Sequence, residues 1–105
     1  MGASIDAWLS ADDLGAELGA RATLVQFSSA FCAPCRATRL VLEQVAGQVA
    51  GVRHVEIDAE SHLELVRRVA VQATPTTLVL DEAGRVRVRA SGVPRAQQVL
   101  SALAA

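Results

Sequence analysis

The stretch Phe31-Cys32-Ala33-Pro34-Cys35 contains both cysteines of the 105-residue chain. Two thiols separated by two residues can close a small disulfide or supply half of a metal site, and the flanking sequence decides between them. An apolar, β-branched run over 22–27 precedes the pair and predicts a buried strand. Apolar residues at helical spacing follow over 36–46. The cysteine pair is therefore expected at a strand-to-helix junction.

Such a junction favours a negatively charged sulfur. The first amide N–H groups of a helix have no partner within the helix, and the helix dipole places partial positive charge there. Both effects should stabilise the thiolate of Cys32 and make it nucleophilic near neutral pH. Pro34 suits the first helical turn, because no hydrogen bond is lost there. The sequence therefore favours redox chemistry.

The composition limits size and partners. We expect a single domain over 1–105 with its own core. The formal net charge of -1 gives no argument for a nucleic-acid partner. All ten basic residues are arginine, which excludes lysine-based chemistry. Two cysteines are too few for a secreted disulfide scaffold, and neither a signal peptide nor a membrane span is expected. A cytoplasmic monomer is the default expectation.

The rest of the chain predicts alternating helices and strands. Ser10 and the two acids after it are typical of a helix N-terminus. A short helix is expected there up to about residue 20, with Leu14 and Leu18 buried. Trp8 is expected to pack against it. The further elements expected are strands over 52–58, 76–81 and 85–90 and helices over 36–49, 61–69 and from Pro94 onward, the last packed through Val99, Leu100 and Leu103.

Local signals refine the second half of the chain. Ser61-His62-Leu63-Glu64 has the spacing of a capping box, which predicts a helix start. A turn over 82–84 joins the last two strands into a hairpin. In the second arm, Arg85, Arg87 and Arg89 alternate with valine. They could form an anion-binding stripe, but a charged and solvated sheet edge is the favoured interpretation.

This order places a strand–helix–strand unit before an antiparallel hairpin. The expected fold is α/β, with a single mixed central β-sheet of parallel strands plus the C-terminal hairpin. Helices should flank it on both faces. Along the strand over 52–58, His54 and Glu56 should point to one face of the sheet and Val55 and Ile57 to the other.

With the dithiol at the junction and Thr74-Pro75 before the hairpin, the chain resembles the thioredoxin family from about residue 22 to its end. The resemblance implies a thioredoxin-like fold. It also implies that Cys32 is the nucleophile and Cys35 the resolving thiol. Pro75 matches a family proline that is cis and lies beside the dithiol.

The resemblance further implies a surface for an extended substrate. A cis bond before Pro75 would leave the backbone of Thr74 free to pair with it. Gly92 matches a glycine that keeps the rim of the groove low. The residues expected to bind substrate are Phe31, Ala33, Pro34, Thr74, Pro75 and Gly92.

The chain departs from the family pattern Trp-Cys-Gly-Pro-Cys. Phe31 replaces the tryptophan and loses its indole donor, and Ala33 replaces the glycine and adds a methyl group. Ser28 stands where an aromatic residue is usual. Gln26 occupies the position of the family's buried aspartate, which is thought to relay the proton when the resolving cysteine attacks. His54 occupies the position of the family's buried lysine.

Gln26 and His54 thus replace two buried charges by groups that can be neutral. We expect a hydrogen bond between them and a tuning effect on the dithiol. One hypothesis makes His54 a weak proton acceptor near Cys35. The alternative is a satisfied polar pair in the core with no catalytic part.

These expectations favour a thiol–disulfide oxidoreductase that reduces protein disulfides. An upstream reductase would supply electrons, because no glycine-rich nucleotide-binding loop is present and no cofactor is expected. An oxidant or isomerase and a non-catalytic partner-binding module of the same fold stay open as alternatives. A zinc module is disfavoured, since His54 and His62 lie on different predicted elements and a closed site needs two ligands besides the cysteines.

Overall fold

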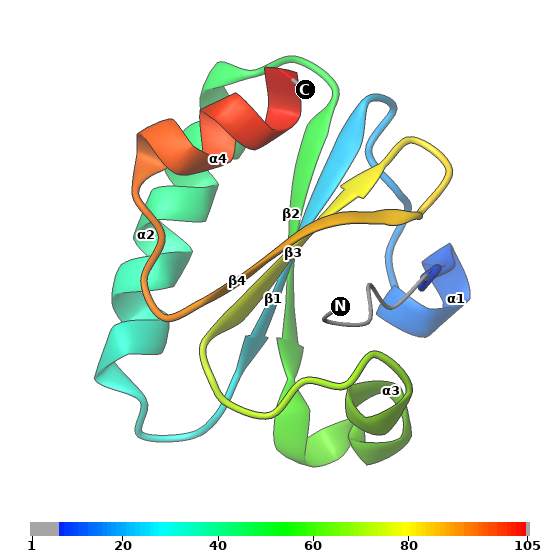
Figure 1. Ribbon diagram of the computed structural model, residues 1–105, viewed down its shortest axis with the longest axis vertical. Helices are drawn as coiled ribbons and strands as arrows, with labels where there is room; N and C mark the ends of the chain where they lie inside the picture. Colours follow the sequence, from blue (N-terminus) through cyan, green and yellow to red (C-terminus); the bar gives the residue numbers. More distant parts are fainter. Residues whose placement is uncertain (1–6, 105) are drawn as a thin grey trace, which may run out of the picture.

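The computed structural model describes residues 7–104. Its strands form one mixed sheet in the order β2-β1-β3-β4, with β1 parallel to β2 and β3 antiparallel to both of its neighbours. Their bounds are β1 (Ala22–Ser28), β2 (Val52–Asp58), β3 (Thr76–Asp81) and β4 (Val86–Ser91). Figure 1 shows the twisted sheet in the middle of the molecule. The predicted mixed sheet and C-terminal hairpin are confirmed.

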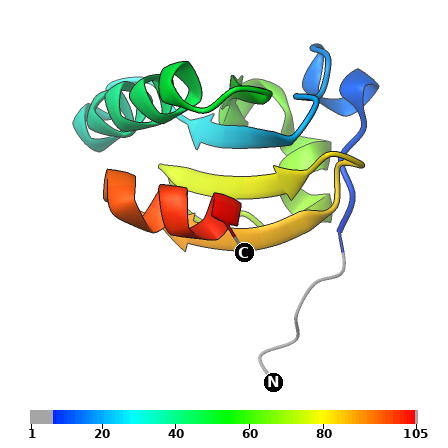
Figure 2. The same ribbon diagram turned by 90° about the horizontal axis from the view of Figure 1, so that it is seen from above.

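Helices cover both faces of the sheet (Figures 1 and 2). They are α1 (Ala11–Leu14), α2 (Ala33–Gln48), α3 (Leu63–Arg68) and α4 (Ala96–Ala104), with a 3₁₀ turn η1 (Ala59–Ser61) after β2. α2 and α4 pack on one face around Leu24, Leu42 and Val99. Within residues 7–104, no helix combines the length and the apolarity that crossing a bilayer requires.

The second core lies on the other face, under α1 and α3. It contains Phe27 and Ile57 from the sheet and Leu65 from α3. β1 is buried along its whole length, because it has a neighbouring strand on each side and a core on each face. Successive side chains of β1 point to opposite faces of the sheet, so Phe27 lies in this core and Leu24 lies in the core under α2. Gln26, two residues from Leu24, therefore faces α2.

The N-terminal region differs from the prediction. α1 ends at Leu14, because Gly15 adopts a left-handed backbone (φ 65°) that closes the helix after one turn. Leu14 is buried as expected, but Leu18 lies beyond the helix and is only partly buried. Trp8 is 53% exposed, and the guanidinium of Arg85 lies 5.9 Å from its ring centroid.

The capping box predicted at Ser61 is wrong. Asp58, at the end of β2, accepts hydrogen bonds from the Glu60 amide (3.1 Å) and the Ser61 hydroxyl (2.8 Å). These bonds hold the chain in η1, so α3 begins two residues later at Leu63. In α4, Val99 is buried as expected, whereas Leu100 is exposed.

The arginines of the hairpin have different roles. β4 is an edge strand, as predicted. Arg89 reaches back to the end of α3, where Nη2 donates to Val69 O (2.6 Å) and Nη1 donates to Ala70 O (3.4 Å). A cation that binds the free carbonyl groups of a helix C-terminus also interacts favourably with the helix dipole. Arg89 therefore joins the hairpin to α3 and is not merely a solvated charge.

Arg89→Ala should lower the free energy of unfolding by about 1 kcal/mol, because it removes charged hydrogen bonds from carbonyl groups at the end of α3. Urea unfolding measures the change. Arg87→Ala is the matched control from the same strand and should stay within about 0.5 kcal/mol of wild type. Equal losses in both variants would contradict the capping role.

Candidate active site

Cys32 and Cys35 form a disulfide at the junction of β1 and α2, with their Cα atoms 5.2 Å apart. Cys32 is the N-cap residue of α2, and its Sγ accepts a hydrogen bond from the Cys35 amide (3.2 Å). Cys35 is only 2% exposed, whereas Cys32 is partly exposed. An attacking group can therefore reach Cys32 but not Cys35. Phe31, with a left-handed backbone (φ 57°), presents a fully exposed ring next to it.

The loop before β3 lies against the loop before the dithiol. The Thr74–Pro75 peptide bond is cis. The Thr74 hydroxyl is 2.7 Å from the Ser29 hydroxyl, and Pro75 O accepts a hydrogen bond from the Gly92 amide (3.0 Å). Three segments that are far apart in the sequence thus lie side by side. Sequence reasoning missed Ser29, because its partner lies 45 residues away and no local pattern marks it.

Gln26 is fully buried beneath the dithiol, and each polar atom of its amide has a partner. Nε2 donates to Cys35 O (2.8 Å) and to Ser28 Oγ (2.9 Å). Oε1 lies 3.0 Å from His54 Nε2. The expected contact between Gln26 and His54 is therefore present, and Gln26 also holds the first turn of α2 through the Cys35 carbonyl.

The network beyond Gln26 was not predicted. The Ser28 hydroxyl donates to Glu56 Oε2 (2.7 Å). Glu56 in turn accepts two hydrogen bonds from Arg39, at 2.7 Å from Nε and 2.9 Å from Nη2. These hydrogen bonds from Arg39 lower the pKa of Glu56 more than its partial burial raises it. Ser28 and Glu56 meet only through the parallel register of β1 and β2, which the sequence does not show.

Hydrogen-bond accounting fixes the tautomer of His54. Cys35 O can only accept, so the NH₂ group of Gln26 must face it and the Gln26 oxygen must face His54. His54 Nε2 therefore carries a hydrogen. Burial lowers the pKa of His54 below its ordinary value of 6.5, although the charge of Glu56 opposes this effect. The imidazole is thus neutral at pH 7, and the nitrogen that faces Gln26 cannot accept a proton.

Thr77 lies directly across from Gln26 in the pairing of β1 with β3. Within residues 7–104, its Oγ1 is the one buried side-chain oxygen or nitrogen that lacks a hydrogen-bond partner. A buried hydroxyl without a partner lowers stability, because it gives up its hydrogen bonds to water on folding.

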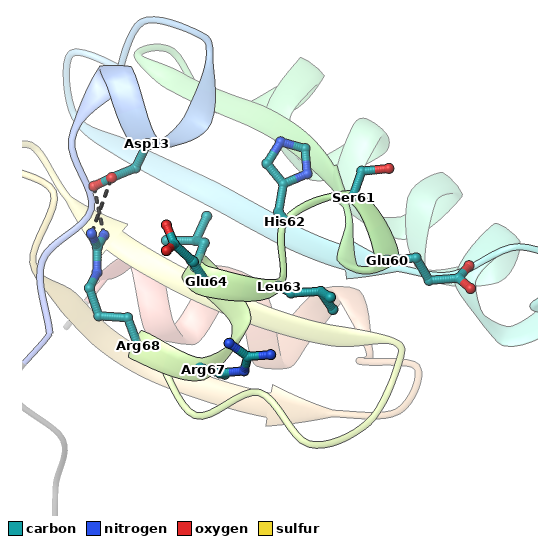
Figure 3. Close-up of a pocket in the computed structure, with 9 residues that line it drawn as sticks. Asp13, Glu60, Ser61, His62, Leu63, Glu64, Arg67 and Arg68 are labelled. Carbon is teal, nitrogen blue, oxygen red and sulfur yellow. Dashed lines mark hydrogen bonds and ion pairs between the residues drawn. The ribbon is translucent and has the colours of Figure 1, made fainter.

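A large cavity lies elsewhere, between α1, η1 and α3 (Figure 3). It has a volume of about 750 Å³, and none of the residues predicted for the site lines it. At one end, Arg68 Nη2 lies 2.7 Å from Asp13 Oδ2, and this hydrogen bond lowers the pKa of Asp13 to about 2. Within residues 7–104, no three His, Cys, Asp or Glu side chains gather where they could hold a metal ion.

The Thioredoxin family model matches residues 9–105. The chain belongs to this family. A thioredoxin-like protein from Synechocystis sp. is 32% identical over 81 residues, covering 76% of each chain. Thioredoxin H2-1 from Oryza sativa is 29% identical over 66 residues, covering 60% of this chain and 48% of that protein. Thioredoxin domain-containing protein 2 from Homo sapiens is 35% identical over 71 residues, 65% of this chain and 13% of that protein. The chain thus spans less than half the length of the last two relatives.

Solved thioredoxin structures share the fold. Chloroplastic thioredoxin z superposes with a TM-score of 0.71 at 27% identity, covering 81% of this chain and 77% of that one. A mutant thioredoxin from Halobacterium salinarum gives 0.73 at 21% identity, covering 88% and 78%. The protein therefore has the thioredoxin-like fold, with its cysteine pair as the CxxC motif, and this arrangement is consistent with thiol–disulfide redox activity.

His54→Ala should leave the pH dependence of disulfide exchange unchanged between pH 5 and 8, because the nitrogen that faces Gln26 already holds a hydrogen. Stability should respond instead. In wild type, the lowered pKa of His54 means that the unfolded chain binds a proton first as the pH falls below about 6.5. The free energy of unfolding then decreases. Urea unfolding at pH 7.5 and 5.5 should show a smaller decrease for the variant.

His62→Ala is the control for this experiment, since the other histidine is exposed on the surface. An exchange rate that loses its dependence on pH near 6 only in His54→Ala would restore the proton-acceptor hypothesis.

Thr77→Val should raise the free energy of unfolding by about 1 kcal/mol, because it replaces an unpaired buried hydroxyl by a methyl group of similar shape. Thermal or urea unfolding measures the change. Thr38→Val is the matched control, since the buried Thr38 hydroxyl donates to Pro34 O (2.9 Å) and its loss should destabilise. A destabilised Thr77→Val variant would show that the Thr77 hydroxyl is satisfied in solution.

Proposed function

We propose that the protein is a thiol–disulfide oxidoreductase that reduces disulfides in protein substrates. The observation that supports this is the asymmetry of the CxxC pair: Cys32 is accessible at the start of α2, while Cys35 is buried beside it. A nucleophile must meet the substrate, whereas a resolving thiol has only to reach its neighbour.

The reaction has two exchange steps. The Cys32 thiolate attacks one sulfur of the substrate disulfide, which forms a mixed disulfide and releases one substrate thiolate. Cys35 then gives up its proton and attacks the Cys32 sulfur. This closes the Cys32–Cys35 disulfide and releases the second substrate thiolate, so two electrons pass to the substrate. Helix α2 favours the first step, because its free amide groups and dipole stabilise the thiolate.

The substrate surface proposed here surrounds Cys32. Phe31, Ala33 and Pro34 are exposed on the α2 side. Thr74, Pro75 and Gly92 would form the opposite wall, where an extended chain would pair with the Thr74 backbone, although the Pro75 side chain itself is buried. Val93, which follows Gly92, adds exposed apolar surface that sequence reasoning missed.

The proposal includes an electron donor. Each turnover leaves the pair oxidised, so a reducing cycle needs an upstream reductase that opens the disulfide again. The protein would then act as an electron carrier between two proteins, as a cytoplasmic monomer without a cofactor of its own. Gln26 and His54 would tune the dithiol by holding the Cys35 turn.

Dithiothreitol-driven reduction of insulin disulfides tests the activity. Wild type should accelerate the reaction, and Cys32→Ser should fall to the background rate because the nucleophile is gone. In a separate reaction, reduced Cys35→Ser mixed with insulin after the dithiothreitol has been removed should accumulate a mixed disulfide with the substrate, visible by mass, because no second thiol is present to resolve it. An intact wild-type fold without acceleration would favour a non-catalytic binding module.

Equilibration with a glutathione series tests the direction. Dithiols of this kind span about -270 mV for reductases to about -120 mV for strong oxidants. We expect a value near the reducing end. A value nearer -150 mV would replace the reductase assignment with an oxidant or isomerase.

A further inference from the structure

A series of hydrogen bonds with fixed donors and acceptors joins the surface pair Arg39–Glu56 to Cys35. Glu56 can only accept, so the Ser28 hydroxyl must donate to it. The lone pairs of that hydroxyl then face Gln26, which donates both to Ser28 and to Cys35 O. Neither Ser28 nor Gln26 can exchange its donor and acceptor roles without losing its hydrogen bond to Glu56 or to Cys35 O, respectively. Glu56 is thus the single anion to which the network around Cys35 is oriented.

The small side chain at position 28 makes this network possible. Ser28 is buried, and a cavity of about 370 Å³ lies beside it, lined also by Ser29, Ala30, Arg39, Glu56 and Asp58. An aromatic ring at this position would supply no aliphatic hydroxyl to bridge Gln26 and Glu56. Serine at this position therefore connects a buried amide to a surface charge.

Arg39 balances that charge close to the dithiol. It lies four residues after Cys35 on α2, one helical turn away on the same face. Its two hydrogen bonds with Glu56 form a bidentate pair, the strong geometry for these groups. Glu43, a further turn along α2, adds a negative charge near Arg39. Removing either member of the Arg39–Glu56 pair would leave an unbalanced charge next to the first turn of α2.

We propose that charge cancellation within the Arg39–Glu56 ion pair, which is connected to Cys35 through Ser28 and Gln26, keeps the reduction potential of the Cys32–Cys35 dithiol close to the value that the rest of the site gives it. This inference rests on the proposed redox function. Both residues are positioning residues, because they act on the dithiol through other groups. The physical basis is that reduction creates a thiolate at Cys32, whose energy depends on nearby net charge. While Arg39 and Glu56 are both charged, their charges cancel and the energy of the Cys32 thiolate is almost unaffected. When only one of them remains, its net charge changes that energy.

The two single variants should therefore act in opposite directions. Glu56→Gln leaves Arg39 unbalanced, which stabilises the thiolate and the reduced protein; its amide oxygen can still accept from Ser28. The measured quantity is the equilibrium constant for reduction of the protein disulfide by two molecules of glutathione, which yields the protein dithiol and glutathione disulfide. In Glu56→Gln this constant should rise about threefold. Arg39→Gln leaves Glu56 unbalanced, and the same constant should fall about threefold. At about 30 mV per tenfold, each change corresponds to about 15 mV.

Redox equilibration of intact wild type and variants, read by mass after thiol alkylation, measures these constants. The double variant Arg39→Gln/Glu56→Gln should return close to wild type, because no net charge remains. Asp13→Asn and Arg68→Gln break an ion pair of equal length that lines the distant cavity, and they should leave the constant unchanged.

Shifts of opposite sign in the two single variants support the inference. Shifts of the same sign, or none, overturn it, because a purely structural role would loosen the site in the same way whichever partner is removed. In that case the proposed function stands if the wild-type pair equilibrates with glutathione. A wild-type pair that never closes reversibly overturns the proposed function and this inference together.

Discussion

A buried amide must use all of its polar atoms, and at Gln26 this requirement organises the site. Gln26 lies on the central strand, enclosed by neighbouring strands and by α2, where water cannot complete its hydrogen bonds. Its NH₂ group faces Cys35 O and Ser28, and its oxygen faces His54. Gln26 therefore stabilises the first turn of α2, which contains Cys35, and it determines which nitrogen of His54 carries the hydrogen. It also donates to the Ser28 hydroxyl.

This arrangement moves charge out of the core. The family pattern has a carboxylate at the position of Gln26 and a lysine at that of His54, two ions with a large desolvation penalty when buried. Here both positions hold neutral groups. The charged carboxylate nearest to them in the network is Glu56, which is partly solvated and paired with Arg39. Surface charges need little desolvation, so an ion pair at this position costs less stability than two buried ions would.

The parts of the fold that depend on local pattern could be predicted from the sequence. Strand periodicity and the placement of the CxxC pair predicted the mixed sheet. The alternation along β2 correctly placed His54 and Glu56 on one face of the sheet and Val55 and Ile57 on the other. The errors arose where a competing local contact decided the outcome. Gly15 ended α1 early, and Asp58 took the Ser61 hydroxyl that was expected to cap α3.

The missed members of the site share a different cause. Ser28 and Glu56 are 28 residues apart, and Arg39 meets Glu56 across 17 residues. Each residue alone is an ordinary polar residue on a predicted element. Only the register of β1 against β2, together with the rotation of α2 over them, brings the three together. Arg89 was likewise not recognised from the sequence, because its partners at the end of α3 lie about 20 residues away.

The hydrogen bond between Ser29 and Thr74 has a consequence for recognition. It ties the loop before the dithiol to the loop that carries Pro75, so the two sides of the proposed substrate surface are held relative to each other before anything binds. Binding to loosely held loops is weakened by the conformational entropy lost as they become ordered. An extended segment bound at the proposed substrate surface would meet a preorganised surface. More of its contact energy then remains as affinity, and segments that would require the walls to move apart are disfavoured.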